Sequence, residues 1–265
     1  TNSVRVRTGN VSAGTSMFAM VVLEKPLSKV YPEIDMVATP DGKPVAMVHV
    51  NTCTSDLDAW VKLFAQLLEA AGANLTKAQL YDMLYFQALE GDADCGGLVS
   101  YNCYSGEPVT GLEEGRPLLV RQPENKLTLP NFMRAQLYAA MATLQIGMEL
   151  LWAEDVQVEK LYGHGGLFKT KGVGQRLLAG ALGVPVAVME TAGEGGPWGM
   201  ALLAAYRKNR AQGETLPQYL EQRVFAGAAG DCVEPNPADR EGFQRYIARY
   251  RAGLAVEKEA GKALQ

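Results

Sequence analysis

The spacing of the apolar residues changes near residue 54, and this change constrains the fold more than any other feature. Before it, residues 17–24 and 44–50 form short apolar runs with β-branched residues, a pattern typical of strands. A turn sequence, Thr-Pro-Asp-Gly at 39–42, separates the two runs. After residue 54, apolar residues recur every three or four positions, as in helices. The chain is therefore predicted to begin with an antiparallel meander of strands.

Two helices are predicted directly after this meander. The first begins near Ser55, where Asp58 stands three residues later and forms a weak capping box, and it ends near Gly72. The second begins at Thr76, with Gln79 in the corresponding position. Each helix carries apolar residues on one face, so both are expected to pack against the rest of the chain.

The strongest helical pattern covers residues 131–152, directly after Pro130. A strand over 97–104 and a polar loop to about residue 128 are expected before it. After it, strand and helix alternate as far as residue 209. This alternation favours parallel strands that are joined by helical crossovers.

A last helix is predicted from Pro237, because residues such as Phe243 and Tyr250 recur on one face. Its polar end, from Glu257 onward, is expected to fray. No repeat or interdomain linker interrupts the chain, so residues 1–265 are predicted to form a single domain. The predicted fold class is α/β of the ribonuclease H type: a mixed sheet with an antiparallel N-terminal meander, flanked by helices.

The composition excludes several classes of function. The chain has 265 residues, a formal net charge of −4 and no long basic run, so a nucleic-acid or anionic-membrane partner is not expected. No apolar run reaches the length of a membrane span, and no secretory signal is recognisable. These features predict a cytoplasmic globular protein that is long enough to bury a sizeable core.

The cysteines and histidines limit the chemistry. The four cysteines, Cys53, Cys95, Cys103 and Cys232, include no Cys-x-x-Cys pair, and there are two histidines. A zinc site is therefore not expected, and the thiols are interpreted as reduced and mostly buried. A hydrolase that uses Cys or Ser is also disfavoured, because no cysteine and histidine are neighbours and no Gly-x-Ser-x-Gly elbow occurs.

The first candidate site is the corner Gly14-Thr15-Ser16 in the N-terminal meander. A glycine followed by two hydroxyl residues in a hairpin presents backbone N–H groups and Oγ atoms that suit a phosphate. In the alternative interpretation, the two hydroxyls only satisfy backbone groups of the turn. Taken alone, the corner favours this second interpretation.

The second candidate site is the glycine-rich stretch 163–175, where three glycines stand within four residues at the end of a predicted strand. Such a turn lets the backbone approach a flat or anionic ligand, and Lys169 and Lys171 add positive charge beside it. The stretch is neither a P-loop nor a Rossmann fingerprint. The alternative is a glycine turn with a structural role alone.

Two weaker candidates complete the set. Gly195, Gly196 and Gly199 open a predicted helix, and tight helix packing is the favoured reason for them. Glu107 stands in a loop and has no evident partner in the sequence. It is interpreted as a solvated or salt-bridged residue rather than a catalytic one.

Taken in order, these features resemble the C-terminal half of the FGGY family of carbohydrate kinases. The segments that carry the resemblance are SAGTS at 12–16, YSGEPVT at 104–110, PNFMRAQLYAAM at 130–141, GQRLLAGALGVPV at 174–186 and PNPADREGFQRYIARYR at 235–251. The resemblance covers about residues 10–253. It is the order of the segments, more than any one of them, that makes it specific.

The resemblance implies an actin-like fold, in which two ribonuclease H-type domains close over a cleft. In that cleft, kinases of this family transfer a phosphoryl group from ATP to a sugar hydroxyl, with Mg²⁺ on the phosphates of ATP or ADP. This chain then corresponds to the second domain, which holds most of the nucleotide. The residues assigned to the β/γ-phosphates are Gly14, Thr15 and Ser16, and those assigned to the adenosine are Gly165, Gly166, Leu167 and Phe168.

The chain departs from the family pattern at several positions. Cys53–Ser55 stand where the family often has Ser-Ala-Gly beside the ribose, and Glu107-Pro108 replaces Glu-Arg. Residues 1–9 contain no Asp or Glu, so the family's catalytic aspartate is expected upstream of residue 1, together with the sugar-binding N-terminal domain. The fragment alone is therefore predicted to bind nucleotide weakly, if at all, and to be catalytically inactive.

Two functions remain open at this point. The first is the ATP-binding half of a sugar kinase that acts on a ketopentose such as xylulose, with the sugar held mainly by the absent N-terminal domain. The second is an actin-like nucleotide-binding module with a regulatory or interaction role and no kinase activity. The sequence leaves open which sugar is used and whether the chain forms a homodimer.

Overall fold

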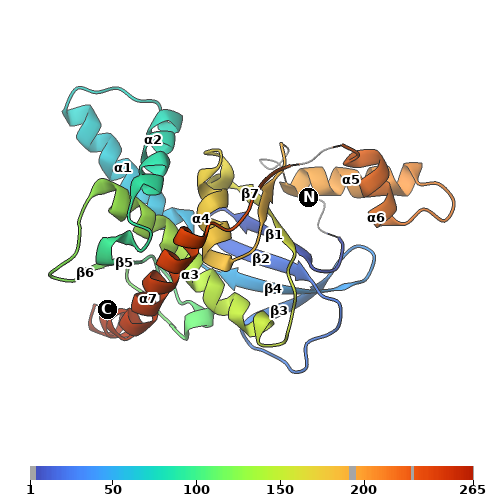
Figure 1. The fold of residues 1–265 in the computed structure, drawn as a ribbon, viewed down its shortest axis with the longest axis horizontal. Coiled ribbons are helices and arrows are strands. Elements are labelled where there is room, and N and C mark those ends of the chain that lie inside the picture. Colours follow the sequence, from blue (N-terminus) through green and yellow to red (C-terminus); the bar gives the residue numbers. More distant parts are fainter. Residues whose placement is uncertain (1–3, 191–194, 228–229, 265) are drawn as a thin grey trace.

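The structure, a computed structural model, describes residues 4–190, 195–227 and 230–264. A seven-stranded mixed sheet forms its centre (Figure 1). In order across the sheet, the strands are β3 (Ile34–Ala38), β4 (Pro44–Val50), β2 (Met17–Val22), β1 (Thr8–Ala13), β7 (Lys160–Gly165), β8 (Val186–Val188) and β9 (Asp231–Val233). A separate small sheet consists of β5 (Leu98–Tyr101) and β6 (Leu118–Arg121).

The middle of the large sheet has the predicted topology. β1, β2 and β4 form an antiparallel meander, and β7 and β8 continue the sheet in parallel on the other side of β1. β3, β6 and β9 are not predicted from the sequence. β3 is an edge strand whose residues after Ile34 are exposed, and β6 and β9 are too short to show a hydrophobic period.

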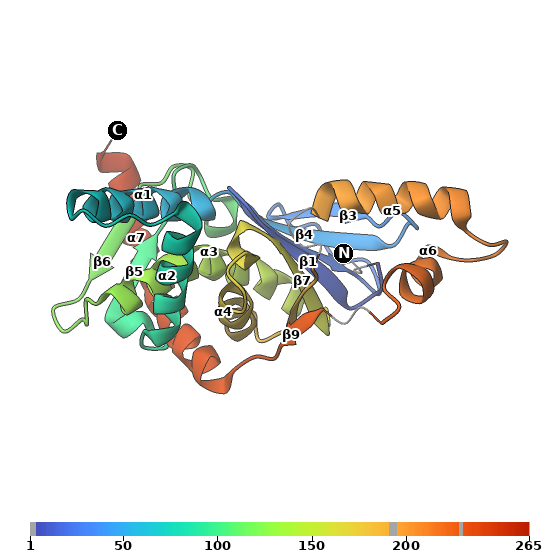
Figure 2. The same ribbon diagram turned by 90° about the horizontal axis from the view of Figure 1, so that it is seen from above.

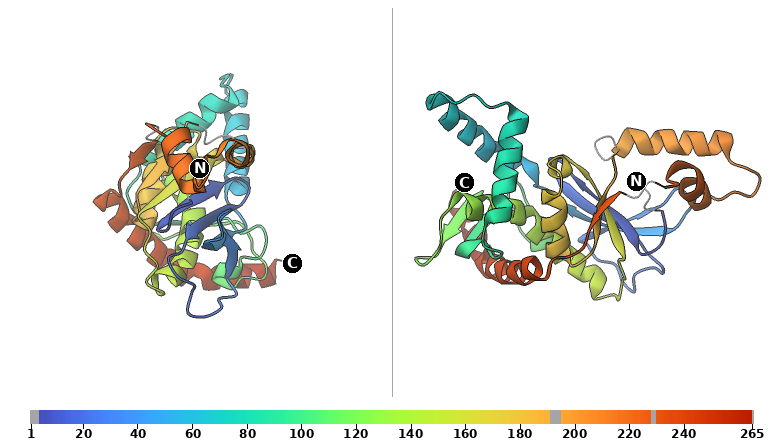
Figure 3. Two further views of the ribbon diagram at one scale, coloured as in Figure 1. Left: turned by 90° about the vertical axis from the view of Figure 1, so that its right-hand side faces the viewer. Right: turned by 45° about the horizontal axis from the view of Figure 1, so that its top comes forward.

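Helices cover both faces of the large sheet (Figure 2). α3 (Leu129–Trp152) and α4 (Val173–Leu182) pack on one face, with α7 (Pro237–Ala263) against them, and α5 (Gly195–Asn209) lies on the other face. α1 (Thr54–Ala70) and α2 (Lys77–Glu90) project from one end of the molecule, and α5 and α6 (Leu216–Tyr219) from the other (Figure 3). Short helical turns occupy Cys95–Gly97 (η1), Pro108–Thr110 (η2), Gly166–Phe168 (η3) and Leu220–Val224 (η5).

α3 is the central helix of the core. The hydroxyl of Thr128 accepts a hydrogen bond from the N–H of Asn131 at 3.3 Å, and Pro130 stands in the first turn. Gly147 lets the helix approach β4, because a Cβ at this position would overlap a methyl group of Val48. α3 is buried over most of its length, which explains why its apolar pattern is the strongest in the chain.

The two helix starts after β4 differ in outcome. Thr76 and Gln79 form the predicted capping box at the start of α2. The N-cap of α1 is Cys53, two residues before the predicted Ser55, and no side chain caps the helix, so the capping box predicted at Ser55 is wrong. The N–H of Thr54 donates instead to the carbonyl oxygen of Gly14 at 3.1 Å. A tertiary contact therefore takes the place of a local cap.

The end of α7 does not fray, contrary to the prediction. The helix continues to Ala263, and Glu257 is fully buried. The carboxylate of Glu257 accepts a hydrogen bond from the N–H of Arg116 at 2.6 Å, and the Arg116 side chain donates to the carbonyl oxygen of Leu264 at 2.7 Å. The loop that precedes β6 therefore covers this end of the helix.

The apolar side chains form two clusters. The large one fills the space between the main sheet and α3, α4 and α7. The small one lies between α5 and α6 and contains Leu202, Leu216, Tyr219 and Leu220. In the part of the chain that the structure describes, none of the helices combines the length and the apolar character that a membrane crossing requires.

Candidate functional site

The corner predicted to hold phosphate joins β1 to β2. The carbonyl oxygen of Gly14 accepts hydrogen bonds from the backbone N–H of Thr54 at 3.1 Å and from its hydroxyl at 2.8 Å. The carbonyl oxygen of Thr15 accepts from the N–H of Cys53 at 2.7 Å, and that of Ser16 accepts from the N–H of Gly14 at 2.9 Å. All three carbonyl groups of the corner are thus bound within the protein.

The donors of the corner are in a different situation. Within the described residues, the N–H groups and hydroxyls of Thr15 and Ser16 have no hydrogen-bond acceptor. Gly14 and Thr15 are exposed, and Ser16 is half-buried. Backbone N–H groups left free at a tight turn form a concave site for an anion. The corner is therefore able to donate hydrogen bonds to an anionic ligand.

β7 brings the glycine-rich turn beside this corner. It runs parallel to β1, with Ser12 opposite His164 and Ala13 opposite Gly165, so both strands end at the same edge of the sheet. Gly165 has a φ of +97°, and a Cβ there would overlap the carbonyl oxygen of Ala13. Glycine is required here for the backbone conformation and for the close approach of the two strands. The first two candidate segments are therefore adjacent in space.

Leu167 and Phe168 lie deeper than the glycines. Both side chains are buried, and the ring of Phe168 packs against Gly163 in β7. Gly166 and Lys169 are exposed. In this conformation, the two apolar side chains hold the turn in place, and the backbone of the glycines forms the accessible surface.

Of the two lysines predicted beside the turn, Lys169 is exposed and Lys171 is paired with an acid. Lys171 forms an ion pair with Asp231 of β9 at 2.8 Å, on the surface of the protein. Hydrogen bonding to Asp231 and its charge raise the pKa of Lys171. Its charge is thus partly neutralised by Asp231 of β9, a strand that is not predicted from the sequence.

The third candidate stretch leads from β8 into α5, and its residues 191–194 lie outside the described residues. A Cβ at Gly195 would lie 3.0 Å from Nδ1 of His164. At Gly196 and Gly199, an added Cβ would meet no atom within 4 Å. Tight packing, which the sequence favours as the reason for these glycines, therefore holds at Gly195 alone.

The side chain of His164, in β7, points from the sheet toward the start of α5. Its Nε2 is 3.0 Å from Nδ2 of Asn10, which comes from the neighbouring strand β1. Burial lowers the pKa of His164, so the neutral imidazole is favoured. The neutral ring accepts the hydrogen bond from the amide of Asn10, and the pair joins the two strands just before they reach the candidate site.

Glu107 is buried, contrary to the prediction of a solvated or salt-bridged side chain. It is 1% exposed, and its Oε2 accepts a hydrogen bond from the N–H of Asn51 at 2.9 Å. Desolvation by burial raises the pKa of Glu107 to about 7, although the backbone N–H groups of Asn51 and Thr52 act in the opposite direction. Its second oxygen, Oε1, has no hydrogen-bond partner in the described part of the chain.

Asp56, in the first turn of α1, is another buried acid, and it is not among the candidates predicted from the sequence. Burial raises its pKa, and hydrogen bonds to Trp60 and Tyr104 lower it less. An acid in the first turn of a helix is ordinarily explained by the helix dipole, so its residue type carries no distinguishing signal. For Glu107, the signal in the sequence is its place in a loop that resembles a family motif.

Three of the four thiols are buried, as predicted, and Cys232 is exposed. Burial raises the pKa of Cys53 and that of Cys103 to about 12. Burial also raises the pKa of Cys95. Because the thiolate is the reactive form, these three cysteines are unsuited to nucleophilic chemistry near neutral pH.

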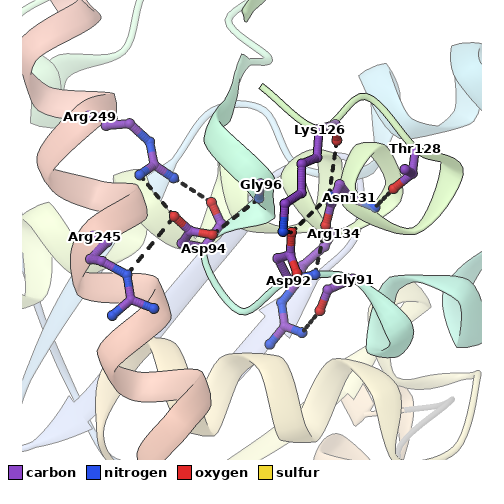
Figure 4. Close-up of polar contacts among 10 residues, drawn as sticks. All are labelled: Gly91, Asp92, Asp94, Gly96, Lys126, Thr128, Asn131, Arg134, Arg245 and Arg249. Carbon is purple, nitrogen blue, oxygen red and sulfur yellow. Dashed lines mark hydrogen bonds and ion pairs between the residues drawn. The ribbon is translucent and has the colours of Figure 1, made fainter. Parts of the chain in front are cut away.

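A second polar cluster joins the loop after α2 to α3 and α7 (Figure 4). Asp94 pairs with Arg249 of α7 at 3.1 Å, and Asp92 pairs with Lys126 at 3.1 Å. Asn131 of α3 accepts a hydrogen bond from the N–H of Asp92 at 2.7 Å and donates to the carbonyl oxygen of Lys126 at 3.0 Å. The charged groups of this cluster pair with one another, so it is suited to stabilising the fold rather than to binding a ligand.

In the three described ranges, no group of three His, Cys, Asp or Glu side chains is close enough together to hold a metal ion. The oxygen donors at the corner itself are the hydroxyls of Thr15 and Ser16. A Mg²⁺ ion at this site would therefore take most of its ligands from the phosphates of a bound nucleotide and from water.

The geometry is matched by a sequence comparison. Residues 9–207 match the family model described as FGGY family of carbohydrate kinases, C-terminal domain. The match includes the corner, the glycine-rich turn and most of α5. No curated protein matches the chain.

Solved structures with a similar fold include kinases of xylulose, gluconate and glycerol. The xylulose kinase from Rhodospirillum rubrum is 18% identical, with a TM-score of 0.73 over 96% of this chain and 48% of that chain. The gluconate kinase from Lactobacillus acidophilus is 18% identical, with a TM-score of 0.72 over 98% of this chain and 50% of that chain. The Plasmodium falciparum glycerol kinase with ADP is 14% identical, with a TM-score of 0.67 over 96% of this chain and 47% of that chain.

At these identities, the likeness shows the fold, which is the actin-like ATPase fold that the sequence resemblance implies. The chain spans about half the length of each of these structures. The half that it covers contains the corner and the glycine-rich turn at one edge of the sheet.

Proposed function

Because this chain belongs to the FGGY family of carbohydrate kinases and contains its C-terminal domain, we propose that it is the nucleotide-binding half of a sugar kinase. The reaction transfers the γ-phosphoryl group of ATP to a hydroxyl of a carbohydrate. Phosphoryl transfer depends mainly on positioning the phosphates and on neutralising their charge. In this proposal, the chain positions the phosphates and neutralises part of their charge.

The observation that carries the proposal is the polarity of the corner. Its three carbonyl oxygens accept hydrogen bonds from within the protein, while the N–H groups and hydroxyls of Thr15 and Ser16 are left as donors. This arrangement removes the groups that would repel an anion and keeps those that attract one. We assign Gly14, Thr15 and Ser16 to the β- and γ-phosphates.

The adenosine is assigned to the glycine-rich turn at the same edge of the sheet. Gly165 and Gly166 offer a backbone surface without side chains, and the buried side chains of Leu167 and Phe168 support it. Ala13 stands opposite Gly165, and Gly14 follows Ala13 directly, so one nucleotide is able to contact both segments. Mg²⁺, when bound with the nucleotide, supplies the remaining neutralisation of charge.

The sugar is assigned to the part of the kinases that this chain does not match. The chain spans about half of the structures that share its fold, so the acceptor and the catalytic base belong to the other half in this proposal. A ketopentose such as xylulose is the acceptor to test first, because xylulose kinases are among the proteins with a similar fold.

ADP with Mg²⁺ at millimolar concentration is expected to raise the melting temperature of the protein, because a ligand of the native state stabilises it. Gly14→Ala should weaken this binding about tenfold or more, which corresponds to roughly 1.4 kcal/mol. An added Cβ at Gly14 meets no protein atom within 4 Å, so the methyl group would obstruct the ligand and not the fold. Isothermal titration calorimetry measures the change in affinity.

Glu241→Ala is the control, because the exposed side chain of Glu241 in α7 lies outside every segment assigned to the nucleotide. It should bind ADP like the wild type. The absence of any ADP-dependent change in the wild-type protein would contradict the proposed function. Equal affinities of the Gly14→Ala variant and the wild type would contradict the assignment of the corner.

Residues 1–265 alone should show no phosphorylation of xylulose by ATP. The physical reason is that the acceptor must be held in line with the γ-phosphate, and in this proposal the surface that holds it lies in the other half of the kinase. A coupled assay of ADP release, with and without xylulose, measures the rate. A xylulose-dependent rate above the rate without protein would contradict the expectation.

A further inference from the structure

The backbone of Glu107 is held in place within its own loop. Its backbone forms a pair of hydrogen bonds with Leu112, from N–H to carbonyl oxygen at 2.7 Å and in return at 3.2 Å. A Cβ at the preceding Gly106 would overlap the carbonyl oxygen of Glu113, so the loop is closely packed at this point. The carboxylate is therefore presented in a fixed position.

The carboxylate reaches from this loop to the segment that follows β4. It accepts a hydrogen bond from the N–H of Asn51 at 2.9 Å and also interacts with the N–H of Thr52. The side chain of Asn51 donates back to the carbonyl oxygen of Gly106, and Asn102 donates to the carbonyl oxygen of Thr52 at 3.0 Å. Residues 51 and 52 are thus held by several hydrogen bonds to the loop that contains Glu107.

The next two residues of the same segment hold the corner. The N–H of Cys53 donates to the carbonyl oxygen of Thr15 at 2.7 Å, and the N–H of Thr54 donates to that of Gly14 at 3.1 Å. Glu107 is thus separated from the corner by one short stretch of polypeptide, residues 51–54. That stretch is fixed by Glu107 at its first two residues and fixes the corner with its last two.

We propose that Glu107 is a positioning residue for the phosphate corner, acting through the backbone of residues 51–54. The carboxylate orders this segment so that Cys53 and Thr54 bind the carbonyl oxygens of the corner. The free N–H groups of Thr15 and Ser16 are then directed away from the protein. The inference rests on the proposed function, because the corner has this role only if it binds phosphate.

The surroundings of Glu107 favour its protonation when its side chain is docked, that is, bound to the backbone N–H groups of Asn51 and Thr52. The titratable groups whose pKa its charge raises are Cys103 and Tyr250. In the described ranges no Lys, Arg or His pairs with it, and Oε1 is buried without a partner. An undocked carboxylate in water would release its proton at a lower pH than the docked one. Protonation therefore stabilises docking, and docking weakens as the pH rises toward 7.

The inference is tested by amide hydrogen exchange of Cys53 and Thr54 in the 265-residue chain. Glu107→Ala should speed exchange at these two amides by about tenfold or more, because the loss of one or two hydrogen bonds frees residues 51–54. The amide of Leu144, in the buried middle of α3, is the internal reference for global unfolding. Glu107→Gln keeps an acceptor oxygen and should restore most of the protection.

Glu257→Ala is the matched control. Glu257 is another buried carboxylate with one unpartnered oxygen, and it accepts a backbone hydrogen bond from Arg116 at the far end of α7. Its replacement should leave exchange at Cys53 and Thr54 unchanged relative to Leu144. Unchanged exchange at these amides in Glu107→Ala, or an equal increase at Leu144, would overturn the inference.

A pH series keeps the test decisive if Glu107→Ala does not fold. In the wild type, protection of Cys53 and Thr54 should fall on the order of tenfold between pH 5.5 and 7.5, after correction for intrinsic exchange. In Glu107→Gln it should stay constant. Equal pH dependence in the two proteins would overturn the inference. Because no nucleotide is present, a failure of this test is distinct from a failure of the wild-type protein to bind ADP.

Discussion

Asp239→Ala should lower the free energy of unfolding by about 3–5 kcal/mol, since it leaves the charge of Arg134 buried and uncompensated. The side chains of Arg134 and Asp239 are 2% and 3% exposed, and they form an ion pair between α3 and the start of α7. Arg176 of α4 donates to the same carboxylate at 2.6 Å. Burial opposes the ionisation of Asp239, but hydrogen bonds and charges from Arg176 and Arg134 outweigh it and lower its pKa.

Arg134 also holds the loop after α2. It donates to the carbonyl oxygen of Gly91 at 3.0 Å, beside the cluster of Asp92 and Asn131 (Figure 4). It donates to the hydroxyl of Tyr138 at 3.1 and 3.2 Å as well. These contacts do not neutralise the guanidinium, so Asp239 is the residue whose loss exposes the full penalty.

Urea unfolding followed by circular dichroism measures this effect. The double variant Arg134→Met with Asp239→Ala should be more stable than Asp239→Ala alone, because no unpaired charge remains in the core. Glu241→Ala, which breaks the exposed pair between Glu241 and Arg245, is the surface control and should have a far smaller effect. A loss of stability in Asp239→Ala no greater than in this control would contradict the prediction.

The stability of the wild type relative to Glu107→Gln should fall by about 2–3 kcal/mol between pH 5 and pH 8. The pKa of Glu107 is about 7 in the folded protein, above its ordinary value of 4.5. Between these two values, the native state holds a proton that the unfolded chain has released. The contribution of this proton to stability is therefore largest at low pH and is lost as the pH rises through 7.

The comparison with Glu107→Gln isolates this one group, because every other titrating residue is present in both proteins. His164, for example, has a lowered pKa and changes stability in the opposite direction over the same range. Glu113→Gln, in the exposed part of the same loop, is the control for introducing a glutamine there. A difference in unfolding free energy between wild type and Glu107→Gln that is constant from pH 5 to pH 8 would contradict the prediction.

The features predicted well from the sequence are those that depend on neighbours in the chain. The apolar period of residues 131–152 identifies α3, and the capping box of Thr76 and Gln79 identifies the start of α2. Gly165 and Gly166 mark the sharp turn at the end of β7, since the positive φ of Gly165 is a conformation that glycine adopts readily. Each of these patterns repeats or closes within a few residues.

The features predicted wrongly depend on residues that are distant in the chain. Glu107 is predicted to be solvated or salt-bridged, and its burial follows from contacts with Asn51 and Thr52. The cap of α1 comes from Gly14 and not from Ser55. The polar end of α7 is ordered by Arg116, which binds Glu257. In each case, a distant segment supplies the partner that local polarity does not reveal.

By itself, the sequence determined the type of fold and the antiparallel meander at its start, because hydrophobic periodicity acts locally. The assignment of two segments to the nucleotide came from the resemblance of the ordered motifs to the family. The tertiary structure decided that these two segments meet, since the parallel pairing of β1 with β7 sets Ala13 beside Gly165. It also decided the polarity of the corner and the burial of Glu107. Hydrogen-bond partners and desolvation are set by packing between distant segments, which no local pattern encodes.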